Sequence, residues 1–232
     1  ALVISSSIED NPARINALVN LARLNRLNHK PESATLHIDQ ALSLARDLPD
    51  FVAEAAYEKA LIELSQSHFR EALTWATSSL AAAGGETKGR CLNLLARIHR
   101  AGGDKNEAVA FALKALDENR RNGRADEEAN ALRLLGSVER ENKRFVESGK
   151  FLRESLEIDK HIGVSLKIAL DLEELAALSG DQGDLNMMAD YLERAYSVHL
   201  NGARVLKAAS TKFKLAEIYR NTGNTALAES AL

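Results

Sequence analysis

Apolar and polar positions along the chain repeat with a period of 36 to 40 residues. In each period an apolar stretch carries one small residue, a short polar turn follows, and a second amphipathic stretch completes the unit. The small residues are Ala22, Ala60, Ala96, Gly136, Ala176 and Ala216. A fixed period in this range is typical of stacked helix-turn-helix units and not of one closed globule.

The spacing inside each stretch follows the helical period. Leu132, Leu135 and Gly136, for example, fall on one face of a helix at positions i, i+3 and i+4, the stripe that buries against a neighbouring element. The first helices of the units are predicted near 13–28, 51–66, 88–101, 126–142, 165–180 and 204–222. The second helices are predicted near 31–47, 69–82, 105–120, 145–161, 185–200 and 225–232.

The turns inside the third, fifth and sixth units read Gly-Gly-Asp, Gln-Gly-Asp and Thr-Gly-Asn. Glycine supplies the left-handed conformation that ends a helix, and the Asp or Asn after it can cap the next helix. The first, second and fourth units have no glycine in this turn and carry short polar residues instead.

Three segments resemble the tetratricopeptide repeat family. They are LRLLGSVERENKRFVESGKFLRESLEI from residue 132, LARIHRAGGDKNEAVAFALKAL from residue 95 and LAEIYRNTGNTALAESAL from residue 215. The family's marks in them are Leu-Gly or Leu-Ala in the first helix and Ala-Leu or Ser-Leu late in the second helix. The segments from residues 95 and 215 also carry Gly-Asp or Gly-Asn at the turn. The later period of 40 residues resembles a longer-period class of this family.

The resemblance implies an all-α fold, a right-handed superhelical solenoid of antiparallel helix pairs. We expect a single solenoid over residues 1–232 with six repeats, the last of them incomplete. Their approximate bounds are 13–50, 51–87, 88–125, 126–164, 165–203 and 204–232. Residues 1–10 are interpreted as the tail of a preceding repeat, so we expect the chain to be a slice of a longer protein.

Composition narrows the class of protein further. A net charge of −3 argues against direct nucleic-acid binding, and no apolar run reaches the roughly 18 residues that span a bilayer. The single cysteine, Cys91, forbids an internal disulfide and fits a reducing compartment. We therefore expect a cytoplasmic location, while an exported or periplasmic one stays open because the chain begins with Ala1 rather than Met.

Candidate chemistry is sparse. Gly84 to Cys91 reads GGETKGRC, which lacks the Lys-Ser/Thr pair of a phosphate loop and is interpreted as an inter-repeat loop. The six histidines have no metal-ligand spacing. Cys91 lies beside Arg90, but a buried core position is the favoured interpretation because free cysteines are usually buried. We predict no catalytic residue, no metal and no cofactor.

In the tetratricopeptide family the first helices line a concave groove. If that geometry applies here, an Arg- and Asn-rich set of residues faces the groove. The predicted ligand-binding set is Arg23, Arg26, Arg90, Asn93, Arg97, Arg100, Asn130, Arg133 and Arg140. Arg guanidinium groups suit carboxylates, so an acidic peptide or an acidic partner helix is the candidate ligand. The alternative is a solvated face whose arginines pair with Glu107, Glu139 or Glu141.

The leading hypothesis for function is a non-enzymatic scaffold that binds protein or peptide in this groove. Tyr57, Leu61 and Phe213 are expected to pack on the ligand. Two alternatives stay open: a sensor or regulatory segment of a larger signalling or transcription-regulator protein, and a structural module that oligomerises through exposed end repeats.

Overall fold

The computed structural model of the chain describes residues 11–224 and 228. The expected tail of a preceding repeat, residues 1–10, lies outside the described residues. So does nearly all of the second helix predicted at 225–232.

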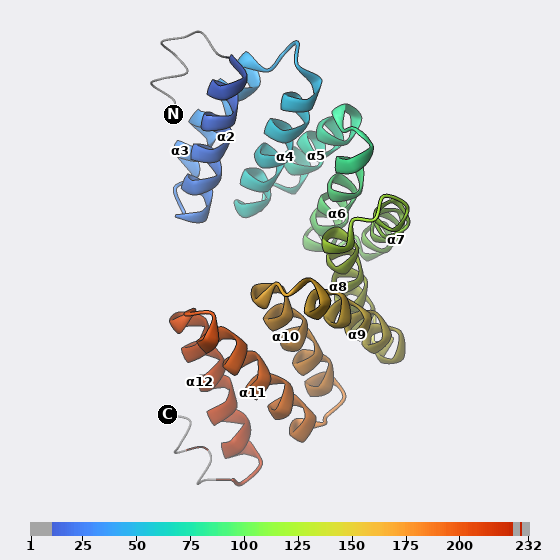
Figure 1. Ribbon diagram of the computed structural model, residues 1–232. Helices are drawn as coiled ribbons and strands as arrows, with labels where there is room; N and C mark the ends of the chain where they lie inside the picture. The colour runs from blue at the N-terminus through green and yellow to red at the C-terminus, as the bar shows by residue number, and fades with distance from the viewer. Residues whose placement is uncertain (1–10, 225–227, 229–232) are drawn as a thin grey trace. The chain divides into compact units, whose positions relative to one another are not determined.

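The described residues form eleven α-helices and no β-strand (Figure 1). The helices are α2 (Asn11–Leu27), α3 (Pro31–Leu44), α4 (Pro49–Ser65), α5 (Phe69–Ala82), α6 (Gly85–Ala101), α7 (Lys105–Arg121), α8 (Ala125–Glu141), α9 (Phe145–Ile162), α10 (Ser165–Asp181), α11 (Leu185–Asn201) and α12 (Val205–Asn221). Successive helices pack as antiparallel pairs, α2 with α3 through α10 with α11, and α12 packs on α11. The predicted all-α architecture of stacked helix pairs is confirmed.

The chain divides into two compact units, Ala1–Gly123 and Arg124–Leu232. The first holds α2 to α7 and the second holds α8 to α12. The single solenoid expected over the whole chain stays a prediction, as do its repeat boundaries.

One segment was predicted wrongly. Residues 84–91, interpreted as an inter-repeat loop, are mostly helical, because α6 begins at Gly85 instead of near residue 88. Gly84 is the N-cap residue in an extended conformation, and its carbonyl oxygen already accepts from the backbone N–H of Lys88 at 3.1 Å. The backbone N–H groups of this segment, which a phosphate loop would direct at its ligand, therefore belong to the first turns of α6.

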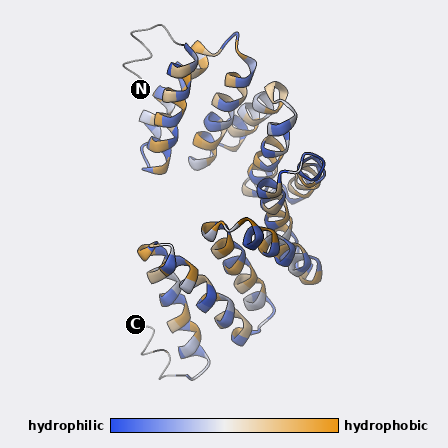
Figure 2. Ribbon diagram, in the orientation of Figure 1, coloured by the Kyte–Doolittle hydropathy of each residue, from blue (hydrophilic) through white to orange (hydrophobic). Residues whose placement is uncertain are grey.

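The core follows the predicted stripe. All six small residues of the repeat are buried, each on the first helix of its pair. Leucine and isoleucine side chains fill the space around them, as in the cluster of Leu94, Leu95 and Ile98 on α6. Figure 2 shows hydrophobic and hydrophilic residues alternating around each helix, as expected for helices that bury one face.

The turns share one backbone geometry whether or not they contain glycine. Gly103, Gly183 and Gly223 have positive φ angles, as predicted. His29, Ser67 and Lys143 adopt φ angles of 56°, 62° and 60° at the matching places in the units that lack glycine. The carboxylates of Asp104 and Asp184 accept from the backbone N–H groups of Glu107 and Met187, so two of the predicted caps form.

Candidate binding surface of the first helices

In the first unit, arginines of α2 and α6 meet carboxylates of α4, the first helix that lies between them in the sequence. Glu54 Oε1 accepts from Arg23 Nη2 at 2.7 Å, and Glu54 Oε2 accepts from Arg90 Nη2 at 2.6 Å. Glu58, which is fully buried, accepts from Arg26 Nε at 2.6 Å and from Arg23 Nε at 3.3 Å. Three of the predicted groove arginines therefore tie neighbouring first helices together.

Arg90 is held on a second side as well. Its guanidinium carbon lies 3.9 Å from the centre of the Tyr57 ring, within cation–π range. Burial lowers the pKa of Arg90, but Glu54 and Tyr57 more than compensate and leave that pKa above its ordinary value. The Arg90 side chain is therefore a fixed cation and part of the packing between α4 and α6.

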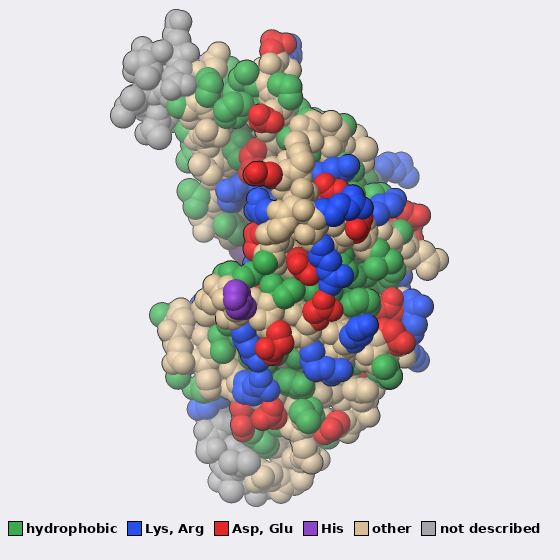
Figure 3. All heavy atoms as spheres, turned by 45° about the vertical axis from the view of Figure 1, so that its right-hand side comes forward, with side chains coloured by type: hydrophobic (Ala, Val, Ile, Leu, Met, Phe, Trp, Pro, Cys, Tyr) green, Lys and Arg blue, Asp and Glu red, His purple; other side chains and the backbone are tan. Residues whose placement is uncertain are grey.

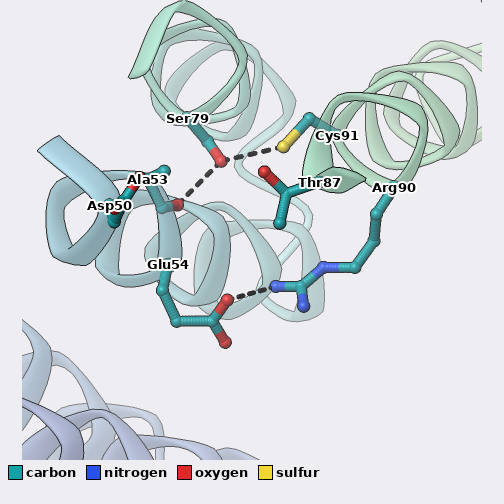
Figure 4. Close-up of a pocket in the computed structure, with 7 residues that line it drawn as sticks. All are labelled: Asp50, Ala53, Glu54, Ser79, Thr87, Arg90 and Cys91. Atoms are coloured by element: carbon teal, nitrogen blue, oxygen red, sulfur yellow. Dashed lines mark hydrogen bonds and ion pairs between the residues drawn. The ribbon is translucent and has the colours of Figure 1, made fainter. Parts of the chain in front are cut away.

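A cavity of about 130 Å³ lies beside this ion pair (Figure 4). It is lined by Asp50, Ala53 and Glu54 of α4, Ser79 of α5, and Thr87, Arg90 and Cys91 of α6. Ser79 Oγ donates to the carbonyl oxygen of Ala53 at 2.8 Å and lies 3.2 Å from Cys91 Sγ. Cys91 is only 2% exposed, which confirms its predicted place in the core.

In the second unit, Arg133 of α8 lies between two buried aspartates. Its Nε donates to Asp171 Oδ1 of α10 at 2.6 Å, and its Nη2 donates to Asp159 Oδ2 of α9. Ser155 Oγ also lies 2.7 Å from Asp171 Oδ1. Burial and the neighbouring Asp171 carboxylate raise the pKa of Asp159 to about 6, although Arg133 opposes the shift. The guanidinium of Arg133 thus pairs with two buried carboxylates, those of Asp159 and Asp171.

The other predicted residues of α8 are also engaged. Arg140 Nη1 donates to Asp181 Oδ2 at 2.7 Å, and Arg140 Nη2 lies 3.6 Å from Glu174 Oε2. Asn130 donates to Glu127 and accepts from Arg133. The placement of Arg133 and Arg140 beside the arginines of α6, which belong to the other unit, stays a prediction.

The remaining predicted residues lie on α6. Asn93 is buried and Arg100 is half-buried, whereas Arg97 is exposed. Within the part of the chain that the structure describes, Arg97 makes no ion pair. Arg97 therefore differs from the arginines that bridge helices, because it is exposed and makes no ion pair in this part of the chain.

Most of the acidic partners of these arginines differ from the three that were predicted. Glu139, one of the three expected, pairs with Arg144. The carboxylates that hold the arginines belong instead to α4, α9 and α10, and they include Glu54, Glu58, Asp159 and Asp171. Part of the signal was present in the sequence: Glu54 of the second repeat stands at the repeat position of Arg90 in the third.

Basic and acidic side chains are also mixed on the face of the molecule that Figure 3 shows, where Lys and Arg are interspersed with Asp and Glu. Over residues 11–224, no group of three or more His, Cys, Asp or Glu residues is arranged to hold a metal ion. Among the described helices, none is long and apolar enough to cross a membrane.

Stacked antiparallel helix pairs with a buried small residue in each first helix define an α-helical repeat protein. Residues 89–122 match the family model of the tetratricopeptide repeat, and they cover nearly all of α6 and α7. This match covers one repeat, and the helix pairs of the described residues have a tetratricopeptide-like fold. No curated protein matches its sequence at a significant level.

Solved structures share the fold. BtubC from P. vanneervenii is 21% identical, with a TM-score of 0.72 over 89% of this chain and 88% of that one. A Rap protein complexed with competence and sporulation factor is 15% identical, with a TM-score of 0.77 over 98% of this chain and 67% of that one. The STAND protein with a tetratricopeptide repeat sensor from Pyrococcus horikoshii is 14% identical, with a TM-score of 0.71 over 96% of this chain and 36% of that one. At these identities the likeness establishes the fold.

Proposed function

We propose that the chain is a non-enzymatic scaffold that binds a protein or peptide along the exposed positions of its first helices. The observation that carries this proposal is the exposed guanidinium of Arg97, which has no ion pair among the described residues. Arg97 lies on α6. The other arginines of the first unit's candidate surface, Arg23, Arg26 and Arg90, are already paired with Glu54 and Glu58 of α4. A similar fold in a Rap protein that is complexed with competence and sporulation factor supports the same class of function.

The proposed mechanism divides the arginines by role. Arg23, Arg26 and Arg90 hold α2, α4 and α6 in register, and Arg97 contacts an acidic group of the ligand. A guanidinium can bind a carboxylate through two parallel hydrogen bonds, which fixes orientation as well as charge. Tyr57 and Leu61 are only partly buried against the core of α4 and α6 and supply apolar surface beside it.

A pull-down from the source lysate, with bound proteins identified by mass spectrometry, tests this function. The unaltered chain is compared with Arg97→Glu and with Arg97→Lys, which keeps the charge but loses the fork geometry. A partner with an acidic segment should be captured by the unaltered chain, weakly by Arg97→Lys and not by Arg97→Glu. Identical captures by all three chains would rule out Arg97 as the contact residue.

A second candidate is a sensor segment of a larger regulatory protein. It is favoured by the similarity to the STAND protein with a repeat sensor, of which this chain matches only 36%. A gene that fuses these repeats to a DNA-binding, kinase or cyclase domain would support this candidate, whereas a gene encoding repeats alone would count against it.

The third candidate, an oligomerisation module, predicts a molar mass in solution that rises with protein concentration. The cytoplasmic location also remains a proposal.

A further inference from the structure

The first helices of the second unit change character along the chain. The residue ten positions before the small residue is Asp126 in α8 but Leu166 in α10 and Leu206 in α12. In the first unit the same position holds Pro12, Asp50 and Glu86. Two successive first helices, α10 and α12, therefore carry leucine at a position where the earlier first helices carry proline or an acidic residue. This position lies outside the buried core.

These leucines are exposed and have apolar neighbours. Leu166 is 46% exposed and Leu206 is 88% exposed. Leu170, one turn after Leu166, is also exposed, as are Val205 and Phe213 on α12. Exposed large apolar side chains gathered on neighbouring helices mark an interaction surface, whereas single ones are ordinary.

One side-chain hydrogen bond links the N-terminal ends of the two helices. Arg204 Nη1 donates to Ser165 Oγ at 3.3 Å, and Leu166 and Leu206 lie one and two residues further along. Leu206 and Phe213 are seven residues apart, which places them on one side of α12 with a rise of about 10.5 Å between them. The opposite side of α12 is buried through Ala208, Leu215 and Ile218.

Basic side chains surround this surface. Helix α12 carries Lys207, Lys212, Lys214 and Arg220, against one acidic residue, Glu217. Within residues 11–224, none of the four basic residues forms an ion pair. The chain as a whole has a net charge of −3, so this concentration of unpaired positive charge is local.

We infer that the exposed side of α10 and α12 binds an acidic amphipathic helix of a partner protein. Leu166, Leu170, Leu206 and Phe213 contact the apolar stripe of that helix, and Lys207, Lys214 and Arg220 contact its acidic residues. This inference rests on the proposed scaffold function and adds the class of ligand and its place in the second unit. The two-turn spacing of Leu206 and Phe213 matches the i, i+7 anchors of helix recognition.

A bilayer and a second copy are the competing occupants. An anionic bilayer attracts basic amphipathic helices, but the overall charge of −3 repels it and half of α12 is already buried against α11. A second copy would bring another basic α12 against this one in a symmetric contact, so like charges would repel each other.

The test uses a fluorescein-labelled helical peptide of about 18 residues, or five turns, which is longer than the two turns between the anchors Leu206 and Phe213. It consists of alanine and glutamate with leucines at the spacing i, i+4, i+7 and i+11. One control peptide replaces every leucine with alanine, and a second replaces every glutamate with lysine. Fluorescence anisotropy measures binding to the whole chain, and we expect only the first peptide to bind.

Four variants locate the site. Leu206→Ser with Phe213→Ser should weaken peptide binding by at least about tenfold, because two buried apolar contacts are lost. Lys214→Glu should weaken it several-fold, with the largest effect at low salt. Leu24→Ser removes a leucine that is 56% exposed in the first unit and should leave binding unchanged. Arg97→Glu reports on the separate contact proposed in the first unit. Circular dichroism checks that each variant keeps its helices.

The outcomes separate this inference from the scaffold function. Peptide binding that is lost in Arg97→Glu but retained in Leu206→Ser with Phe213→Ser would overturn the α10–α12 site and leave the scaffold function standing. Binding to vesicles of phosphatidylserine and phosphatidylcholine that depends on Phe213, or a dimer that Phe213→Ser dissolves, would overturn the inference as well. If neither this peptide nor any lysate protein binds the unaltered chain, both proposals fail.

Discussion

Gly136 of α8 packs directly against Leu152 of α9. A Cβ atom placed on residue 136 would lie 2.5 Å from Leu152 Cγ, which is closer than non-bonded carbon atoms approach. The Gly136 carbonyl oxygen also accepts from Ser148 Oγ at 2.7 Å. The missing side chain therefore sets how closely the two helices of this pair approach.

Gly136→Ala should lower the free energy of unfolding by about 1–3 kcal/mol, the usual cost of overpacking a close contact. Leu152 is fully buried and has little room to move aside. Chemical denaturation followed by circular dichroism measures the change. Gly85→Ala is the matched control, since nothing lies within 4 Å of its added Cβ and alanine favours a helix. Equal effects of the two substitutions would contradict the packing argument.

The helix pairs could be predicted from the sequence because their cause is periodic. Every small residue of the repeat is buried, and every turn within a repeat contains one left-handed residue. Each of these features can be recognised in one repeat and then checked at the same position of the next repeat. The start of α6 was misplaced because Gly84 and Gly85 usually indicate a turn, whereas here Gly84 is the N-cap residue and Gly85 opens the helix.

The turns that lack glycine have a cost in stability. Lys143 follows α8 with a φ angle of 60°, a conformation that disfavours side chains with a Cβ. Lys143→Gly should therefore raise the free energy of unfolding by about 0.5–1 kcal/mol, after allowing for the greater freedom of glycine in the unfolded chain. Thermal and urea denaturation both measure this.

The control for this turn is a glycine that already holds the same conformation. Gly183 has a φ angle of 78° and open space around it, so Gly183→Ala should destabilise the protein through backbone strain alone. A Lys143→Gly protein that is less stable than the unaltered chain would show that the lysine side chain contributes more than its strain costs.

The candidate binding surface was harder to predict than the fold. A sequence places Arg23, Arg90 and Arg133 on exposed positions of helices, but their partners lie 26 to 38 residues away on other helices. Which acidic residue meets which arginine depends on the rotation of each helix, and the hydrophobic period fixes that rotation only loosely. The predicted arginine stripe is therefore mostly internal, and Arg97 alone of its α6 arginines combines exposure with the absence of an ion pair over residues 11–224.

Asp159 makes the stability of the second unit depend on pH. Its pKa is raised from 3.8 to about 6 by burial and by Asp171, so the folded state binds a proton more tightly than the unfolded state does. The stabilising effect of that proton is complete below pH 4 and is lost as the pH rises through 6. This group alone should lower the free energy of unfolding by roughly 2–3 kcal/mol across that window.

Asp159→Asn removes this titration. The difference in melting temperature between the variant and the unaltered chain should grow in favour of the variant between pH 4.5 and pH 7. The difference isolates Asp159, because other carboxylates contribute equally to both proteins. A difference that stays constant over this range would show that Asp159 is ionised throughout.

Arg133 and Arg97 provide the sharpest contrast between a structural and an available arginine. Arg133→Met leaves Asp159 and Asp171 buried without their shared guanidinium, so it should cost at least about 3 kcal/mol at pH 7. The cost should shrink near pH 5, where Asp159 takes up a proton and the buried charge falls. Arg97→Met removes an exposed charge with no ion pair in the described part of the chain and should change stability by less than about 0.5 kcal/mol. Urea denaturation of Arg133→Met and Arg97→Met at pH 5 and at pH 7 measures these changes in the free energy of unfolding. Equal losses at pH 7 would mean that Arg97 is also held within the fold, and its proposed role in ligand binding would have to be abandoned.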